Sequence, residues 1–232
     1  MTESFHDKHY PGETDDYRRA RDELLEAELE LRDRIEEVAA MRRALPPGAP
    51  VKEDYVFEEG APDFRDTRTV TQVKLSELFS PDKSTLILIN TMFAPEDELP
   101  CPMCNMWADG YNAIAPHIAQ RVNFALVTKA DISRLRAWAA AREWRHIRLL
   151  SSHSNSFNRD YLVEIGDAQM PSVTVFTRAE DGKIHHFYSV EGHFARTPGD
   201  PRHIDLCSPL WNLLDLTPEG RGSDWYPGYS YD

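Results

Sequence analysis

Two of the chain's three cysteines, Cys101 and Cys104, lie close together in the segment LPCPMCNM. A C-x-x-C pair can cycle between dithiol and disulfide, can supply two soft ligands to a metal ion, or can be two inert thiols. Three cysteines are too few, and odd in number, for a framework of structural disulfides. The spacing therefore favours redox chemistry, with a metal site and inert thiols as the alternatives.

The position of the pair separates the two thiols. The apolar run STLILIN at residues 84–90 is typical of a buried strand, and a helix is predicted from Pro102 to about Ile118. Pro102 then occupies the first helical position, where its missing N–H costs nothing. The positive end of the helix dipole favours a thiolate on Cys101 over one on Cys104. We expect Cys101 to attack a disulfide or another oxidised sulfur, and Cys104 to resolve the mixed intermediate.

Groups near the pair affect its reactivity. The central Pro-Met dipeptide carries no charge, so it adds no cationic stabilisation of a thiolate. The acidic residues Glu96, Asp97 and Glu98 lie just upstream, and they would raise the pKa of Cys101 if they approached it. Asn90, late in the preceding strand, cannot titrate, so the proton acceptor for Cys104 must be another group or water.

Strand and helix patterns alternate around the motif. The further predicted elements are a strand and a helical turn within 64–79, a strand at 122–128, a helix at 132–144, a strand at 147–152, a short helix at 154–165, a hairpin at 171–190 turning at Asp181-Gly182, and a helix at 202–216 that Pro209 bends or begins. This order predicts an α/β fold with a thioredoxin-like mixed sheet flanked by helices, from about residue 50 onward.

A proline stands directly before the predicted hairpin, in the segment QMPSVTVF. Thioredoxin-like folds place a cis-proline facing the active-site thiols at this point, so we expect a cis Met170–Pro171 bond. Met170, Pro171 and Pro102 are then the expected substrate-binding residues, and Pro171 would keep metal away from the thiols. The alternative is that Pro171 only begins a strand, as proline often does.

The N-terminal quarter has a different character. Residues 1–16 are polar and acidic and are predicted to be a disordered tail, whereas residues 17–45 predict one long helix that ends at LPPGAP. An apolar residue recurs every seven positions on this helix, at Leu24, Leu31, Val38 and Leu45. The expected domains are thus 1–16, 17–45 and a thioredoxin-like domain at 46–232, with a possible homodimer through residues 17–45.

Composition limits the partners. The formal net charge is -13, and an acidic surface repels phosphate backbones, so nucleic acid is not an expected partner. No stretch approaches the roughly 18 apolar residues of a membrane span, and the N-terminus has no apolar signal region. We expect a cytoplasmic protein that does not bind membranes, needs no cofactor, and takes a protein or low-molecular-weight thiol or disulfide as its partner.

Several segments together carry a family resemblance. They are RRALP, VKEDYVFE, LSELF, MFAP, CPMCNMWADG, SSHSNSFNRDY, VFTRAEDGKIHHFYS and LDLTPEGR, which cover nearly all of residues 20–221. The chain resembles the thioredoxin-like proteins grouped as domain of unknown function 899, described as predicted dithiol-disulfide oxidoreductases. The resemblance implies that Cys101 and Cys104 are the redox pair and that Pro171 is the strand-entry proline. Asn105 departs from the serine usual in that family.

Two other functions stay open. One is a copper- or zinc-binding module, in which Cys101, Cys104, Met103 or Met106 and a histidine would be the ligands. We nevertheless expect no metal site. Alternatively, the protein is a non-catalytic interaction module that dimerises through its N-terminal helix.

For several other residues that could be taken for parts of the site, the sequence predicts a position or a role. Asp109 lies roughly 12 Å along the helix from Cys101, too far for a direct bond, and is expected in a surface or capping network. Trp107 is expected in the core, and Cys207 is expected to be a small apolar filler. His185 and His186 share a strand, face opposite sides and cannot easily bind one metal. The residues expected to line a cleft near the thiols are Ser156, Phe157, Asn158 and Asp160.

Overall fold

A computed structural model describes residues 8–192, 195–196 and 198–231. The chain forms two compact units, Met1–Pro46 and Pro47–Asp232. Among the described residues, no helix is both long and apolar enough to cross a bilayer. The expected cytoplasmic location stays a prediction.

The first unit consists mainly of helix α1, Asp15–Arg43. Thr14 caps it, because its hydroxyl accepts a hydrogen bond from the backbone N–H of Tyr17. Two acidic residues open the helix and two arginines close it, so each charge complements the helix dipole. The helix thus begins two residues before the predicted start at residue 17. The predicted disordered tail lies outside the described residues for positions 1–7.

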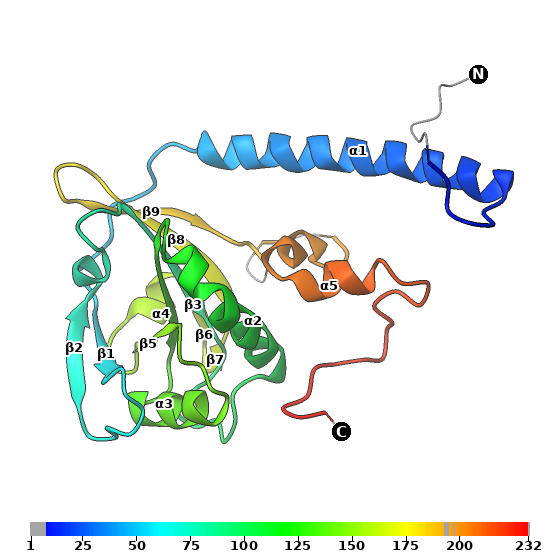
Figure 1. The fold of residues 1–232 in the computed structure, drawn as a ribbon. Helices are drawn as coiled ribbons and strands as arrows, with labels where there is room; N and C mark the ends of the chain where they lie inside the picture. The colour runs from blue at the N-terminus through cyan, green and yellow to red at the C-terminus, as the bar shows by residue number, and fades with distance from the viewer. Residues whose placement is uncertain (1–7, 193–194, 197, 232) are drawn as a thin grey trace. The chain divides into compact units, whose positions relative to one another are not determined.

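The second unit is built on a seven-stranded sheet within the described part of the chain, in the order β2-β1-β5-β4-β3-β8-β9 (Figure 1). Strands β3, β4 and β5 run parallel, and β8 and β9 continue the sheet antiparallel. The strands are β1 Val56–Gly60, β2 Val70–Lys74, β3 Thr85–Asn90, β4 Asn123–Thr128, β5 Arg148–Ser151, β8 Ser172–Arg178 and β9 Ile184–Ser189.

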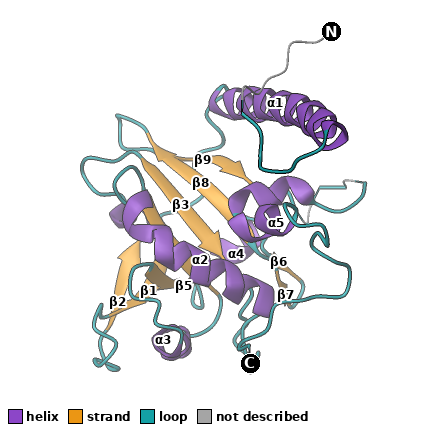
Figure 2. Cartoon of the chain, turned by 45° about the vertical axis from the view of Figure 1, so that its right-hand side comes forward, coloured by secondary structure: helices purple, strands orange, loops and turns teal. Residues whose placement is uncertain are grey.

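Helices cover both faces of this sheet, as Figure 2 shows for α2 in front of the strands and α4 behind them. The helices of the second unit are η1 Leu75–Leu78, α2 Pro102–Ile118, α3 Ile132–Ala141, α4 Phe157–Asp160, η2 Arg202–Cys207 and α5 Pro209–Leu214. The mixed α/β class, the mixed sheet flanked by helices and the long N-terminal helix predicted from the sequence are confirmed.

Alternation along the central strands builds two cores. Leu86 and Leu88 of β3 join the core that contains η1 and α4, and Ile89 joins the core under α2 and α3. Neighbouring side chains on a strand point to opposite faces, so a strand buried on both faces must be apolar throughout. This is why β3 could be recognised as a continuous apolar run.

Two small elements were not predicted. Strand β1 contains two glutamates and a glycine, so it lacks the apolar signal of β3. A second sheet of β6 Glu164–Ile165 and β7 Ala168–Gln169 has only two residues per strand, too few to show a pattern. This short hairpin matters for the site, because it ends directly before Met170 and Pro171.

Candidate active site

Cys101 is the N-cap of α2, and Pro102 occupies its first turn, as the sequence predicts. The backbone N–H of Cys101 donates to Met92 O at 2.9 Å, which joins the start of α2 to the segment after β3. The backbone N–H of Met92 in turn donates to Cys104 Sγ at 3.5 Å. Neither thiol is in a disulfide; Cys101 is partly exposed and Cys104 is buried.

The two thiols differ in acidity. A hydrogen bond from Cys104 is the largest cause that lowers the pKa of Cys101 to about 5, and backbone N–H groups and Tyr226 add to it. The pKa of Cys104 lies well above its usual value, because Cys104 donates to Cys101 and is buried. Near neutral pH, Cys101 is therefore a thiolate and Cys104 a thiol.

The acidic loop before the motif is held by hydrogen bonds of its own. Asp97 turns back on its own loop, where its carboxylate accepts from the backbone N–H of Ala94 at 2.7 Å. The Arg134 guanidinium donates to the carbonyl oxygens of Pro95 and Asp97 and lies 4.9 Å from the Phe93 ring centre. Arg134 thus holds the acidic loop in place and offsets the negative charge of the loop.

The C-terminal tail, residues 217–231, reaches the motif. The hydroxyl of Tyr226 lies 3.8 Å from Cys101 Sγ. Three residues on, the hydroxyl of Tyr229 donates to the carbonyl oxygen of Pro100 at 2.5 Å. Burial, and then the bond to Cys101, raises the pKa of Tyr226 to about 12, so this hydroxyl keeps its proton and donates to the thiolate.

One link that holds the tail runs through Trp138 of α3. Its indole N–H donates to Asn105 Oδ1 at 2.7 Å, and its ring meets that of Tyr229 edge-on at 5.4 Å. Asn105 is the residue that departs from the resembling family, and it is buried. The side chain after Cys104 therefore helps to position the tail over Cys101.

A second link runs through Asp109. Its carboxylate pairs with Arg142 and accepts from the indole N–H of Trp144 at 2.6 Å. Arg142 also donates to the carbonyl oxygen of Tyr229. The sequence predicts Asp109 in a surface or capping network; the structure instead places it in a network that joins α2 to Arg142, Trp144 and the C-terminal tail.

Pro171 faces the thiols across a cavity, but the predicted cis bond is wrong. Among the described residues every peptide bond is trans, including Met170–Pro171. The trans form is the intrinsically preferred one by about 0.5–1 kcal/mol, and β8 starts directly after it as an ordinary strand. Asn90 Nδ2 donates to the carbonyl oxygen of Met170 at 2.6 Å and so holds the approach to Pro171.

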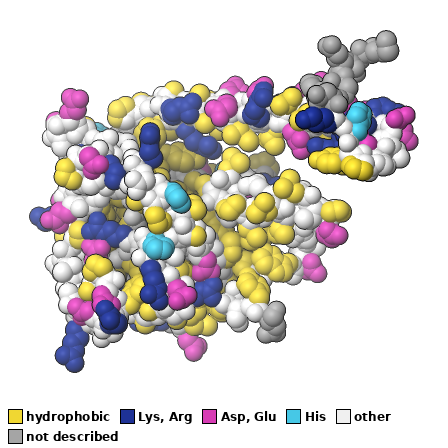
Figure 3. Space-filling model, in the orientation of Figure 1, with side chains coloured by type: hydrophobic (Ala, Val, Ile, Leu, Met, Phe, Trp, Pro, Cys, Tyr) yellow, Lys and Arg dark blue, Asp and Glu magenta, His cyan; other side chains and the backbone are white. Residues whose placement is uncertain are grey.

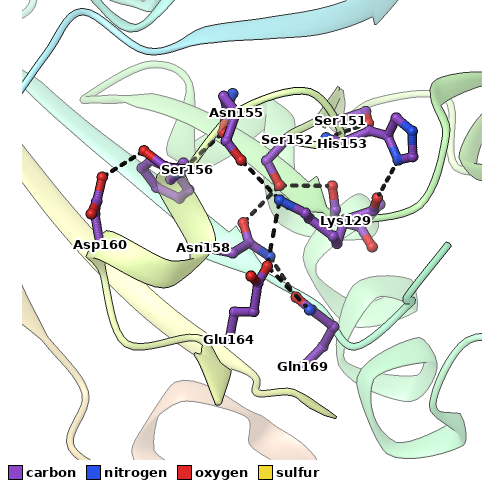
Figure 4. A network of polar contacts seen from close by, with 12 residues as sticks. Lys129, Ser151, Ser152, His153, Asn155, Ser156, Asn158, Asp160, Glu164 and Gln169 are labelled. Atoms are coloured by element: carbon purple, nitrogen blue, oxygen red, sulfur yellow. Dashed lines mark hydrogen bonds and ion pairs between the residues drawn. The ribbon is translucent and has the colours of Figure 1, made fainter. Parts of the chain in front are cut away.

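The residues expected to line the cleft lie elsewhere. Ser156 and Asp160 bond to each other at 2.7 Å, and Phe157 is in the core. Asn158 is buried in the polar network of Figure 4, accepting from Ser152 at 2.6 Å and donating to Gln169 at 2.7 Å. None of the four belongs to the wall of the cavity beside the thiols.

This network still serves the site. Gln169 ends β7, one residue before Met170, and Glu164 of β6 pairs with Lys129 at 3.4 Å. Lys129 also donates to the carbonyl oxygen of Asn155 at 2.8 Å (Figure 4). The network thus fixes the short hairpin that leads into Pro171.

A cavity of about 540 Å³ opens beside the pair. Its wall includes Cys101, Cys104 and Pro171, and also Cys207 and Trp107. Met170 and Pro102, the other expected substrate-binding residues, are not part of that wall as the structure describes it. Cys207, expected from the sequence to be a small apolar filler, faces the same space as Cys101 and Cys104.

The expected metal alternatives gain no geometric support. Within the described ranges, no group of three or more histidine, cysteine, aspartate or glutamate side chains is arranged to hold a metal ion. His185 Nδ1 contacts Gly48 O at 2.9 Å, and His186 Nε2 contacts Ser189 Oγ at 2.9 Å. Burial lowers the pKa of His186.

Sequence reasoning missed Tyr226 and the tail. The available signal was composition: residues 225–231 contain Trp225, Tyr226, Tyr229 and Tyr231. Trp225, Tyr226 and Tyr231 remain exposed, so composition alone does not show which of these side chains contacts the motif.

The chain was then compared with known proteins. Residues 7–231 match the model of a family described as "Bacterial protein of unknown function (DUF899)". Nothing among the curated proteins matches the chain.

Solved structures give distant similarities. A 1-Cys peroxiredoxin, the Plasmodium falciparum antioxidant protein, has a TM-score of 0.48 and 14% identity, covering 73% of this chain and 98% of its own. A Plasmodium vivax 2-Cys peroxiredoxin has a TM-score of 0.46 and 14% identity, covering 77% and 88%. Peroxidoxin BcpB of Mycobacterium tuberculosis has a TM-score of 0.43 and 20% identity, covering 70% and 94%.

Proposed function

The chain belongs to the bacterial family DUF899, whose description assigns no activity, and from its site we propose that it is a thiol-disulfide oxidoreductase. Cys101 is the nucleophile and Cys104 is the resolving thiol. The observation that carries this proposal is the split in acidity: the pKa of Cys101 falls to about 5, while that of its neighbour rises well above the usual value.

The split suits the two steps of exchange. The Cys101 thiolate attacks one sulfur of a disulfide RSSR, the S–S bond breaks, and one thiolate RS⁻ leaves. Cys104 then loses its proton and attacks the Cys101 sulfur, which releases the second thiolate and closes the Cys101–Cys104 disulfide. The protein loses two electrons and the substrate gains them. A dithiol reductant restores the starting state by the reverse exchange.

The proton of Cys104 has a natural destination. Asn90 does not titrate, and its amide is engaged with the Met170 carbonyl. The first departing thiolate is itself a base, and it is released beside Cys104. We infer that this leaving group accepts the proton, which makes an additional protein base unnecessary.

A single-turnover reaction tests the assignment. Reduced protein is mixed with a small disulfide, quenched with acid and weighed by mass spectrometry. We expect wild type and Cys207→Ser, the matched cysteine control, to form the internal disulfide. Cys104→Ser should stop as a mixed disulfide on Cys101, and Cys101→Ser should react at least about a hundredfold more slowly, since its remaining motif thiol is buried and protonated. A Cys101→Ser variant as fast as wild type would refute the roles.

Helix α1 supports a separate proposal, that two copies of the chain pair through it. In the structure none of its residues is buried, and Leu24, Leu31 and Met41 are 48%, 60% and 60% exposed. Leaving such a stripe in water is costly, and pairing two helices would cover it. We expect the full chain to have the mass of a dimer in solution and Leu31→Glu to have that of a monomer, whereas Glu30→Gln, beside it, keeps the dimer. A monomeric wild type would rule the pairing out.

A further inference from the structure

The cavity beside the thiols has a mainly apolar wall. Besides the two cysteines, it is formed by side chains that include Ile89, Trp107, Val173, Val190, Ile204 and Trp225. These residues come from β3, α2, β8 and the segments around α5, so parts of the chain that are far apart in sequence build the cavity together. Figure 3 shows hydrophobic side chains gathered in the region of α5. A ligand in this cavity therefore gains by burying apolar surface.

The cations in the wall are already neutralised. Arg221 Nη1 pairs with Asp205 at 2.6 Å and Nη2 with Asp215 at 2.5 Å, and Arg202 pairs with Asp215 too. The Arg221 guanidinium also lies 5.4 Å from the ring centre of Trp211, which fixes its direction. A ligand carboxylate would have to displace a protein carboxylate to reach either arginine, and it would meet Asp200 and Asp205 in the same wall.

The tail limits access to Cys101. Tyr226 lies against the sulfur, and Tyr229 is bonded to Pro100 directly before it. An extended protein segment would need the backbone on both sides of Cys101, whereas a small molecule needs only the cavity. Its volume of about 540 Å³ is in the range typical of small-molecule sites.

We propose that the substrate bound in this cavity is a small, uncharged disulfide with aryl or alkyl substituents, rather than an anionic peptide disulfide or a protein. This inference rests on the proposed function, since it names the RSSR of the exchange written above. One substituent occupies the apolar cavity while its sulfur meets Cys101. Two RSH equivalents leave and the protein disulfide remains, so atoms and electrons balance.

The test compares two activated disulfides that share one dipyridyl scaffold and differ in charge. Reduced protein reacts in single turnover with neutral 2,2′-dithiodipyridine and with anionic 6,6′-dithiodinicotinate, which is the same scaffold with a carboxylate on each ring, and mass spectrometry follows formation of the Cys101–Cys104 disulfide. Each rate is divided by that of 2-mercaptoethanol thiolate with the same reagent, which removes intrinsic reactivity. The reactions are run in about 0.5 M salt, where screening over about 4 Å suppresses the effect of the net charge of -13. We expect the normalised rates to favour the neutral reagent by at least about tenfold.

A matched pair of variants locates the preference. Ile204 lines the cavity, whereas Leu206, two residues later on the same turn, is 52% exposed and does not. Ile204→Lys should reduce the preference at least about fivefold by placing a cation in the wall, and Leu206→Lys should leave it within about twofold. Equal effects of the two changes, or equal normalised rates in the parent protein, would overturn the inference. Failure to react with either reagent would instead overturn the proposed function.

The parent comparison keeps the test decisive if Ile204→Lys does not fold. Cooperative thermal unfolding shows whether that variant is usable. The preference of the parent protein for the neutral reagent stands or falls without it.

Discussion

The hydroxyl of Tyr226 lies 3.8 Å from Cys101 Sγ, although 125 residues separate the two in the chain. The tail that carries it is fixed at Tyr229 by Trp138, Arg142 and Pro100. Two parts of the chain therefore meet at Cys101: the start of α2 presents its sulfur, and the C-terminal tail partly covers that sulfur and donates to it.

The first prediction concerns pH. The pKa of Cys101 is about 5, so its rate of alkylation by iodoacetamide should rise through pH 5 and be constant from about pH 6.5 to pH 8. Cys104, with its raised pKa, should stay unmodified over the same range. Peptide mapping after timed alkylation measures both thiols in one sample. If the alkylation rate of Cys101 still rose tenfold per pH unit at pH 7.5, its pKa would not be lowered and the prediction would be wrong.

The second prediction ranks the groups that lower this pKa. The hydrogen bond from Cys104 is the largest cause and that from Tyr226 is smaller, so Cys104→Ala should raise the pKa of Cys101 more than Tyr226→Phe does. The titration is followed by thiolate absorbance near 240 nm in Cys207→Ser protein. Tyr229→Phe is the control, because its hydroxyl bonds to the Pro100 carbonyl and not to the thiol. A larger shift in Tyr229→Phe than in Tyr226→Phe would contradict the geometry.

The third prediction concerns the C-terminal tail that partly covers Cys101. Arg142→Ala removes both the pair with Asp109 and the bond to the Tyr229 carbonyl, so the tail should open more often. Alkylation of Cys101 at pH 8 should then be about fivefold faster, as expected for a loss of about 1 kcal/mol of closure. Arg145→Ala is the matched control, since Arg145 pairs with Glu143 on the surface and, in the described part of the chain, not with the tail. Equal rates in the two variants would show that Arg142 does not hold the tail.

The fourth prediction concerns stability. Asn158 is fully buried and bonded to Ser152 and Gln169. Asn158→Ala leaves both partners buried without it, so it should lower the free energy of unfolding by about 2–4 kcal/mol. Ser154→Ala, an exposed change in the same loop, should cost less than about 0.5 kcal/mol. Denaturant titration measures both, and similar costs would mean that the network adds little.

Most elements of the fold could be predicted from local sequence signals. The bounds of α2 agree with the prediction because Pro102 marks its first turn, and β3 was recognisable because both of its faces are buried. Strand β1 was missed because its sequence, VFEEG, contains two glutamates and does not alternate clearly between apolar and polar residues. The hairpin before Pro171 is too short for any period to show.

The site was only half predictable. The identity of Cys101 and Cys104 follows from a local motif, and so does the difference between them, because helix geometry acts within one turn. Tyr226, Asn105 and Arg142 act through contacts between distant parts of the chain, which no local pattern encodes. The expectation of a cis Met170–Pro171 bond came from analogy of position alone, and position does not determine the isomer.

The central claim, that Cys101 and Cys104 form a redox pair, is tested most directly by a redox titration read by mass spectrometry after alkylation. We predict a two-electron transition between dithiol and Cys101–Cys104 disulfide, retained in Cys207→Ser. Cys101 is already a thiolate near neutral pH, so reduction takes up one proton and the midpoint should fall by about 30 mV per unit between about pH 6 and 8. The account is contradicted if the two thiols stay reduced at every accessible potential.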